Sequence, residues 1–159
     1  GVFIVQILFK ALPTEAVRAL QRGGVDAYGL KPERRISDGD GTPCRHCLRN
    51  VDAGDAYLIL AYRPFPALQP YAETGPIFLH ARECDRATEG ETLPEMLASP
   101  DYIVRGYGAD DRIVYGSGAV IPTDAIVARA SALFDSNDIA YVHVRSARNN
   151  CYQCRIERA

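Results

Sequence analysis

The sequence predicts an α+β fold, in which a mostly antiparallel β-sheet carries two main helices packed on it. Most segments with strand-like alternation of apolar and polar residues are separated by turns or irregular stretches, so hairpins are more evident than strand–helix–strand crossovers. Only two longer segments repeat apolar residues with the period of a helix that packs on one side. Helices and strands that are segregated in this way are typical of the α+β class.

The chain begins with one strand and one helix. Residues 3–9 alternate large apolar side chains and are expected to form a strand. Residues 13–22 follow a helical pattern, in which Pro13 is tolerated in the first turn and the pair Gly23-Gly24 ends the helix.

The middle of the chain alternates between loops and strands. Residues 34–41 are polar and rich in glycine, which predicts a loop. Residues 56–62 form a continuous apolar run that is typical of a central strand. Residues 63–76 contain four prolines and are expected to be an extended, irregular loop. Residues 77–80 then form a short strand, and the charged residues 84–92 are expected to be exposed.

The rest of the chain holds the second helix and two hairpins. Residues 93–98 suggest one or two helical turns, and a first hairpin is predicted from residues 102–107 and 112–120. The second helix covers residues 122–134, and residues 139–145 and 151–158 make the second hairpin. That list of elements fits one globular domain over residues 1–159.

Composition excludes several classes of protein. Hydrophobic residues make up 47% of the 159, and the net charge is −2, which argues against general binding to nucleic acid or to an anionic membrane. No apolar run approaches the roughly 20 residues that cross a bilayer, and no export signal is recognised. We therefore expect a cytoplasmic protein whose five cysteines are reduced.

Two Cys-x-x-Cys pairs form the strongest motif, and their members are Cys44, Cys47, Cys151 and Cys154. Two such pairs can hold one tetrahedral zinc ion, which would clamp the first pair to the last hairpin. In zinc knuckles a glycine usually follows the second cysteine, whereas Leu48 and Arg155 follow here. The spare metal ligands are the three histidines, His46, His80 and His143, and Cys84 is expected to be exposed or half-buried without a role.

A second interpretation is a thiol-dependent enzyme that uses Cys44 or Cys151. Neighbouring arginines would favour the thiolate. His143 shares a strand face with Tyr141 and Arg145, and a Cys–His pair oriented by Glu73 or Asp110 would make a nucleophile. A third interpretation is that the two cysteines are small buried residues of the core.

The proline-rich loop suggests a ligand site, because long loops in compact domains are often functional. Its aromatic side chains could line a cleft for a planar or anionic ligand. Together with the first cysteine pair and the last hairpin, the loop frames a predicted binding site for a small molecule or a protein partner, which comprises Cys44, Arg45, Tyr71, Glu73, His143, Arg145 and Cys151.

Several short strings resemble one family. They are Pro-Cys-Arg at 43–45, Pro-Tyr at 70–71, Pro-Ile-Phe at 76–78, Tyr-Val-His-Val at 141–144 and Cys-Tyr at 151–152. In combination they resemble the uncharacterised bacterial family called domain of unknown function 1203, over essentially the whole chain. The resemblance implies no particular activity. It implies that cysteines at 44 and 151 are typical, whereas those at 47 and 154 are often replaced, so a four-cysteine zinc site would be particular to this chain.

Overall fold

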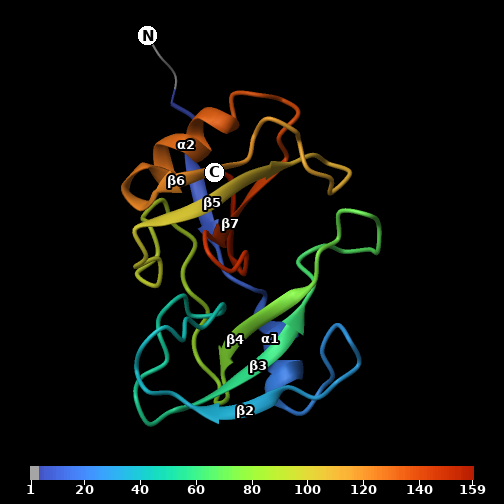
Figure 1. The fold of residues 1–159 in the computed structure, drawn as a ribbon, viewed down its shortest axis with the longest axis vertical. Coiled ribbons are helices and arrows are strands. Elements are labelled where there is room, and N and C mark those ends of the chain that lie inside the picture. The colour runs from blue at the N-terminus through green and yellow to red at the C-terminus, as the bar shows by residue number, and fades with distance from the viewer. Residues whose placement is uncertain (1–3) are drawn as a thin grey trace.

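The computed structural model describes residues 4–159 and contains two antiparallel sheets (Figure 1). The five-stranded sheet has the order β1 (Ile7–Lys10), β8 (Tyr152–Arg158), β7 (Tyr141–Ser146), β5 (Asp101–Tyr107) and β6 (Ala119–Pro122). The three-stranded sheet has the order β2 (Glu33–Ile36), β3 (Ala56–Tyr62) and β4 (Gly75–His80). The helices are α1 (Thr14–Gln21) and α2 (Ile126–Leu133), the latter preceded by the 3-10 turn η1 (Thr123–Ala125). The predicted α+β class is therefore confirmed.

Four predicted elements differ from the structure. Residues 33–36 form the edge strand β2 where the sequence suggested a loop, because all four side chains are exposed and no alternation marks the strand. The hairpin strand predicted from residue 112 begins only at Ala119, where β6 pairs with β5, since a long connection follows Gly108. Residues 93–98 contain turns and no helix. The first predicted strand starts at Ile7, and its residue 3 lies outside the described residues.

The main hydrophobic core lies between α2 and one face of the five-stranded sheet. Val104, Val142 and Ile156 point to this face from three adjacent strands, and all three are fully buried. Ile126 and Ala130 of α2 pack against them with no exposed surface. Apolar burial of this size is the main driving force of folding.

The opposite face of the same sheet carries polar and aromatic side chains. Arg105 of β5 lies opposite His143 of β7, and His143 lies opposite Arg155 of β8. The proline-rich loop covers this face, and its Phe65 ring packs 5.2 Å from the ring of Tyr107. Because successive residues of a strand alternate between faces, the residues beside the core residues are the ones that form this polar layer.

A smaller core joins α1 to the three-stranded sheet. Val17 of α1 is fully buried among residues of β3 and β4, including Leu60 and Leu79. In Figure 1 the three-stranded sheet and α1 lie below the five-stranded sheet, and the chain crosses between the two after β1 and again after β4. None of the helices in residues 4–159 has the length and apolar character needed to cross a bilayer.

Replacement of Ile156 by Ala should lower the free energy of unfolding by about 2–5 kcal/mol, because the side chain has no exposed surface and its loss leaves a cavity. Val120→Ala on β6 is the matched control, since Val120 is 57% exposed and its truncation should change stability by about 0.5 kcal/mol or less. Urea denaturation measures both. Equal losses in the two variants would contradict the position of the core.

Candidate functional site

Four side chains that can bind a metal converge between α1 and the end of β4. The ligand atoms of Cys44, Cys47, His80 and Cys84 all lie within 4.8 Å of one another. The Sγ atoms of Cys44 and Cys84 are 3.9 Å apart, and the Sγ atom of Cys47 is 3.5 Å from Nδ1 of His80. Cys44 is fully buried, whereas the other three are half-buried. This Cys₃His cluster could bind a metal ion.

The first two cysteines sit on a tight turn beside β4. The backbone amide of Leu48 donates to the carbonyl of Cys44 at 2.9 Å, which closes the turn around the pair. Leu48 has a φ of +58°, the left-handed conformation that usually favours glycine. The burial of its side chain in the main core offsets that strain. A knuckle-like turn was therefore not expected from the sequence, because glycine usually occupies this position.

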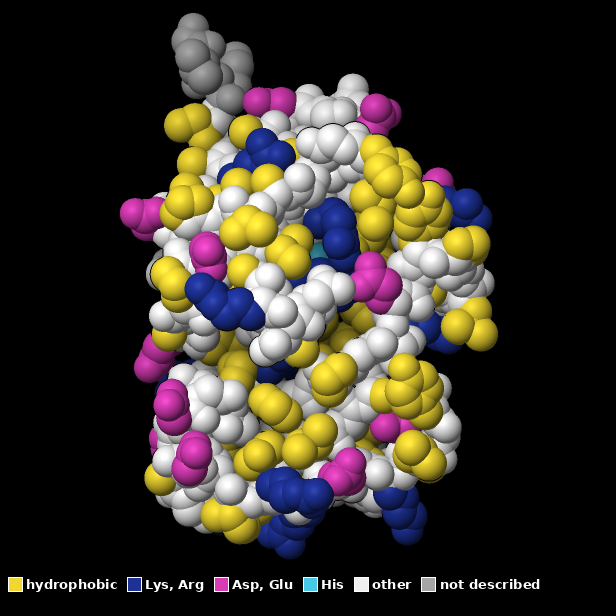
Figure 2. All heavy atoms as spheres, viewed as in Figure 1, with side chains coloured by type: hydrophobic (Ala, Val, Ile, Leu, Met, Phe, Trp, Pro, Cys, Tyr) yellow, Lys and Arg dark blue, Asp and Glu magenta, His cyan; other side chains and the backbone are white. Residues whose placement is uncertain are grey.

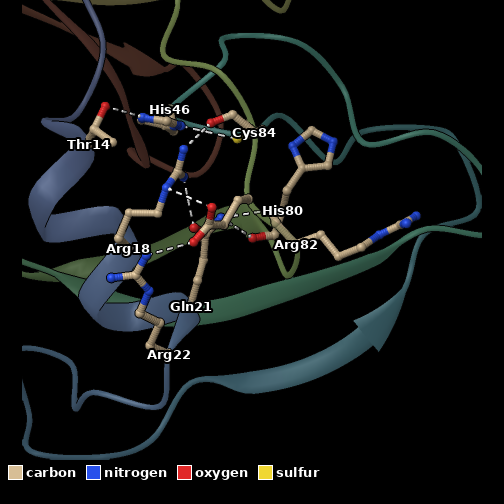
Figure 3. Close-up of polar contacts among 9 residues, drawn as sticks. Thr14, Arg18, Gln21, Arg22, His46, His80, Arg82 and Cys84 are labelled. Atoms are coloured by element: carbon tan, nitrogen blue, oxygen red, sulfur yellow. Dashed lines mark hydrogen bonds and ion pairs between the residues drawn. The ribbon is translucent and has the colours of Figure 1, made fainter.

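His80 and Cys84 are placed by the end of β4 and by side chains of α1 (Figure 3). Gln21 donates from Nε2 to the carbonyls of His80 and Arg82, each at 2.9 Å. Arg18 donates from Nη2 to the carbonyl of Cys84 at 2.8 Å. These bonds fix the backbone between the two ligands, so that the segment turns back toward the Cys44 turn.

His46 supports the cluster without being one of its four members. Its Nδ1 is 3.1 Å from the Sγ of Cys84, and its Nε2 is 2.9 Å from the hydroxyl of Thr14, as Figure 3 shows. Burial lowers the pKa of His46, which favours the neutral ring. A neutral ring can donate from Nδ1 to a cysteine sulfur while it accepts the Thr14 hydroxyl at Nε2.

The electrostatics of the cluster favour one thiolate at Cys44. Hydrogen bonds from the thiols of Cys47 and Cys84 lower the pKa of Cys44, and the backbone amide of His80 also donates to its sulfur at 3.3 Å. Its own hydrogen bond to Cys44 raises the pKa of Cys47 to about 11, and that of Cys84 likewise raises the pKa of Cys84. A side-chain hydrogen bond from the His80 ring to Cys44 raises the pKa of His80. A bound cation would replace the shared protons.

The four-cysteine set predicted from the sequence needs correction. Cys44 and Cys47 meet His80 and Cys84, and not the second cysteine pair. Cys154 faces the main core, because it lies on the same face of β8 as Ile156 and is only 1% exposed. Cys151 precedes β8, and its thiol lies 3.7 Å from the carbonyl of Asn149.

A signal for the correct pair was present in the sequence. His80 and Cys84 are separated by three residues directly after a strand, a close spacing of two good metal ligands. From the sequence, His80 was expected only as a spare ligand, and Cys84 was expected to have no role. Nothing in the linear sequence shows which of the candidate pairs meets Cys44 and Cys47 in space.

The residues of the predicted ligand site are divided by the structure. Glu73 and Arg145 meet, with Oε2 of Glu73 3.5 Å from Nη1 of Arg145, and Cys151 lines the same small cavity. Tyr71 lies apart, where its hydroxyl is 2.8 Å from that of Tyr115. Cys44 belongs to the Cys₃His cluster, and Nε of Arg45 donates to the carbonyl of Tyr152 at 2.8 Å.

His143 is enclosed by aromatic rings. Its ring centre lies 4.6 Å from that of Tyr107, 4.9 Å from Tyr152, and 5.2 Å from both Phe65 and Tyr141. Within residues 4–159 its Nδ1 has no hydrogen-bond partner, and neither proposed cysteine nucleophile is bonded to it. Burial first, and the nearby arginines second, hold the pKa of His143 well below its ordinary value.

Comparisons with known proteins identify one family. Residues 41–158 match the family model described as "Protein of unknown function (DUF1203)", and this range contains all four members of the Cys₃His cluster. No curated protein and no solved structure matches the chain.

The buried His143 should make the protein less stable in acid. Because its pKa is lowered in the folded state, only the unfolded chain takes up this proton below about pH 6.5. This titration therefore leaves the free energy of unfolding unchanged above about pH 6.5 and lowers it by up to about 1.4 kcal/mol per pH unit below that pH. Urea denaturation from pH 7.5 to 5.0 should show a shallower loss for His143→Asn. A constant difference between the two proteins across this range would contradict the prediction.

Proposed function

Because the chain belongs to the DUF1203 family, which is described only as of unknown function, we propose its function from its own site: it is a zinc-binding domain. Cys44, Cys47, His80 and Cys84 are the proposed ligands, and the zinc ion ties the Cys44 turn to the end of β4. The ion would stabilise what we expect to be a single domain.

The spacing of the ligand atoms is the observation that carries this proposal. Zinc binds cysteine sulfur at about 2.3 Å and histidine nitrogen at about 2.0–2.1 Å in a tetrahedron. Neighbouring ligands of such a tetrahedron are about 3.8 Å apart for two sulfurs and about 3.6 Å apart for sulfur and nitrogen. The corresponding distances here are 3.9 Å between Cys44 and Cys84, and 3.5 Å between Cys47 and His80.

The donor set favours a structural ion over a catalytic one. Three thiolates and one imidazole suit zinc and fill all four tetrahedral positions, whereas catalytic zinc keeps one position open. The burial of Cys44 also argues against a thiol-dependent enzyme at this residue, since a nucleophile must reach its substrate. None of the five cysteines forms a disulfide. We also propose a reducing, cytoplasmic environment, which keeps such thiols available as metal ligands.

The purified chain should contain one zinc ion, and Cys84→Ser should lose it, because it removes one of four ligands. Cys151→Ser is the matched control, since it changes a cysteine outside the cluster and should retain the metal. Elemental mass spectrometry of protein purified without a metal-affinity step gives the stoichiometry. A chelator should lower the melting temperature of the parent protein and leave that of Cys84→Ser unchanged. Loss of zinc from Cys151→Ser alone would refute the proposed ligand set.

His46→Leu should weaken zinc binding by about 10- to 100-fold, because the ring no longer donates to the sulfur of Cys84. His143→Asn provides a histidine control on the far face of the five-stranded sheet, and its zinc affinity should match that of the parent. Competition with a chromogenic chelator measures both affinities. Equal weakening by the two substitutions would show that His46 acts only through overall stability.

A further inference from the structure

A separate cavity lies where the proline-rich loop meets the last hairpin. Its volume is about 210 Å³, and the lining residues that matter here are Tyr62, Pro64, Glu73, Arg145, Asn150 and Tyr152. Figure 2 shows basic and acidic side chains close together on the face in view. None of the four proposed zinc ligands lines the cavity, so it is independent of the metal cluster.

The guanidinium of Arg145 is incompletely bonded. The side chain is only 4% exposed, and Nη1 donates to the carbonyl of Asn150 at 3.2 Å and contacts Glu73 at 3.5 Å. Its Nε and Nη2 have no acceptor anywhere in the described part of the chain. A buried charged donor without an acceptor is costly, so these two N–H groups mark a place for an additional acceptor.

The charged side chains at the cavity wall also favour an anionic ligand. Arg105 and Arg145 share a single carboxylate, because Oε1 of Glu73 is 3.0 Å from Nη2 of Arg105 and Oε2 contacts Arg145. Two other acidic side chains on this face are already engaged: Glu157 pairs with Lys10 and Arg155, and Asp111 accepts from the hydroxyl of Tyr141. Two cations and one anion leave one positive charge at the cavity wall.

The shape of the free donors indicates the class of anion. Nε and Nη2 form one edge of the guanidinium fork, which matches the two oxygens of a planar carboxylate. The rings of Tyr62 and Tyr152, with centres 5.5 Å apart, and Pro64 supply apolar walls. A volume of 210 Å³ equals about seven waters, which suits a small organic acid.

We propose that this cavity binds a small carboxylic acid with a flat apolar body. The ligand carboxylate accepts from Nε and Nη2 of Arg145, and its body lies against Tyr62 and Tyr152. Nε and Nη2 are enclosed in this structure, so Glu73, which contacts the neighbouring Nη1, must shift for the ligand to reach them. It is the most exposed of the three charged groups, at 36%, and its bond to Arg145 is longer than its bond to Arg105.

Benzoate is a suitable probe, and benzamide is its uncharged counterpart. In NMR titrations of the ¹⁵N-labelled protein, benzoate should cause saturable shifts at residues 149–152 and at the Arg145 Nε–H signal. Benzamide should bind about tenfold more weakly or worse, since it cannot provide two anionic acceptors. Inorganic phosphate should also bind more weakly than benzoate. Equal affinity for benzoate and benzamide, tighter binding of phosphate, or no saturable benzoate shift would overturn the proposal.

Two substitutions locate the site. Arg145→Lys keeps the charge but removes the fork, and it should weaken benzoate binding about tenfold. Arg148→Lys is the matched control, because Arg148 is exposed and pairs with Asp101 outside the cavity, and it should leave affinity unchanged. Glu73→Gln removes the competing carboxylate and should strengthen binding several-fold. If Arg145→Lys does not fold, Glu73→Gln decides: unchanged or weaker benzoate binding by that variant would overturn the proposal.

Discussion

The turn from Pro43 to Leu48 is hydrogen-bonded to both sheets at once, and the placement of the two sheets relative to each other depends on this constraint. Its backbone pairs with β4 through the amide of Arg45 and the carbonyl of Phe78, at 3.1 Å. The buried Arg45 guanidinium donates across to the carbonyl of Tyr152, at the start of β8. Burial lowers the pKa of Arg45 to about 10, so it remains charged near neutral pH. One short segment therefore aligns the two sheets and presents Cys44 to its neighbours.

The two proposed sites lie at opposite ends of β4 and rely on different interactions. On one side, soft sulfur and nitrogen donors gather at the end of β4, where hydrogen bonds from α1 fix the backbone. On the other side, hard, charged groups meet beneath a loop with little regular structure of its own. The four ligand atoms of the Cys₃His cluster lie close enough together to surround one ion, whereas the guanidinium of Arg145 has two N–H groups without acceptors. Their chemistry therefore separates a stabilising role from a recognition role.

Patterns in the sequence were sufficient to predict a helix or strand where one face of that element is buried. The helix at residues 14–21 and the strands at 56–62, 141–146 and 152–158 all have such a face, and they were predicted within a few residues. The strand at 33–36 was missed because none of its side chains is buried. The Cys-x-x-Cys motif identified Cys44 and Cys47 as members of the cluster. It could not identify their partners His80 and Cys84, because that pairing depends on how α1 packs against β4. The left-handed conformation of Leu48 could not be predicted either, because tertiary packing stabilises it.

The exposed strand β2 has a consequence for association between chains. It forms one edge of its sheet, and such an edge offers unpaired backbone groups to any other extended segment. Three of its four residues, Glu33, Arg34 and Arg35, are charged, and the fourth is an exposed Ile36. Another chain that added a strand here would have to accommodate these ionic side chains along its length. The charged edge therefore protects the sheet from strand-to-strand aggregation.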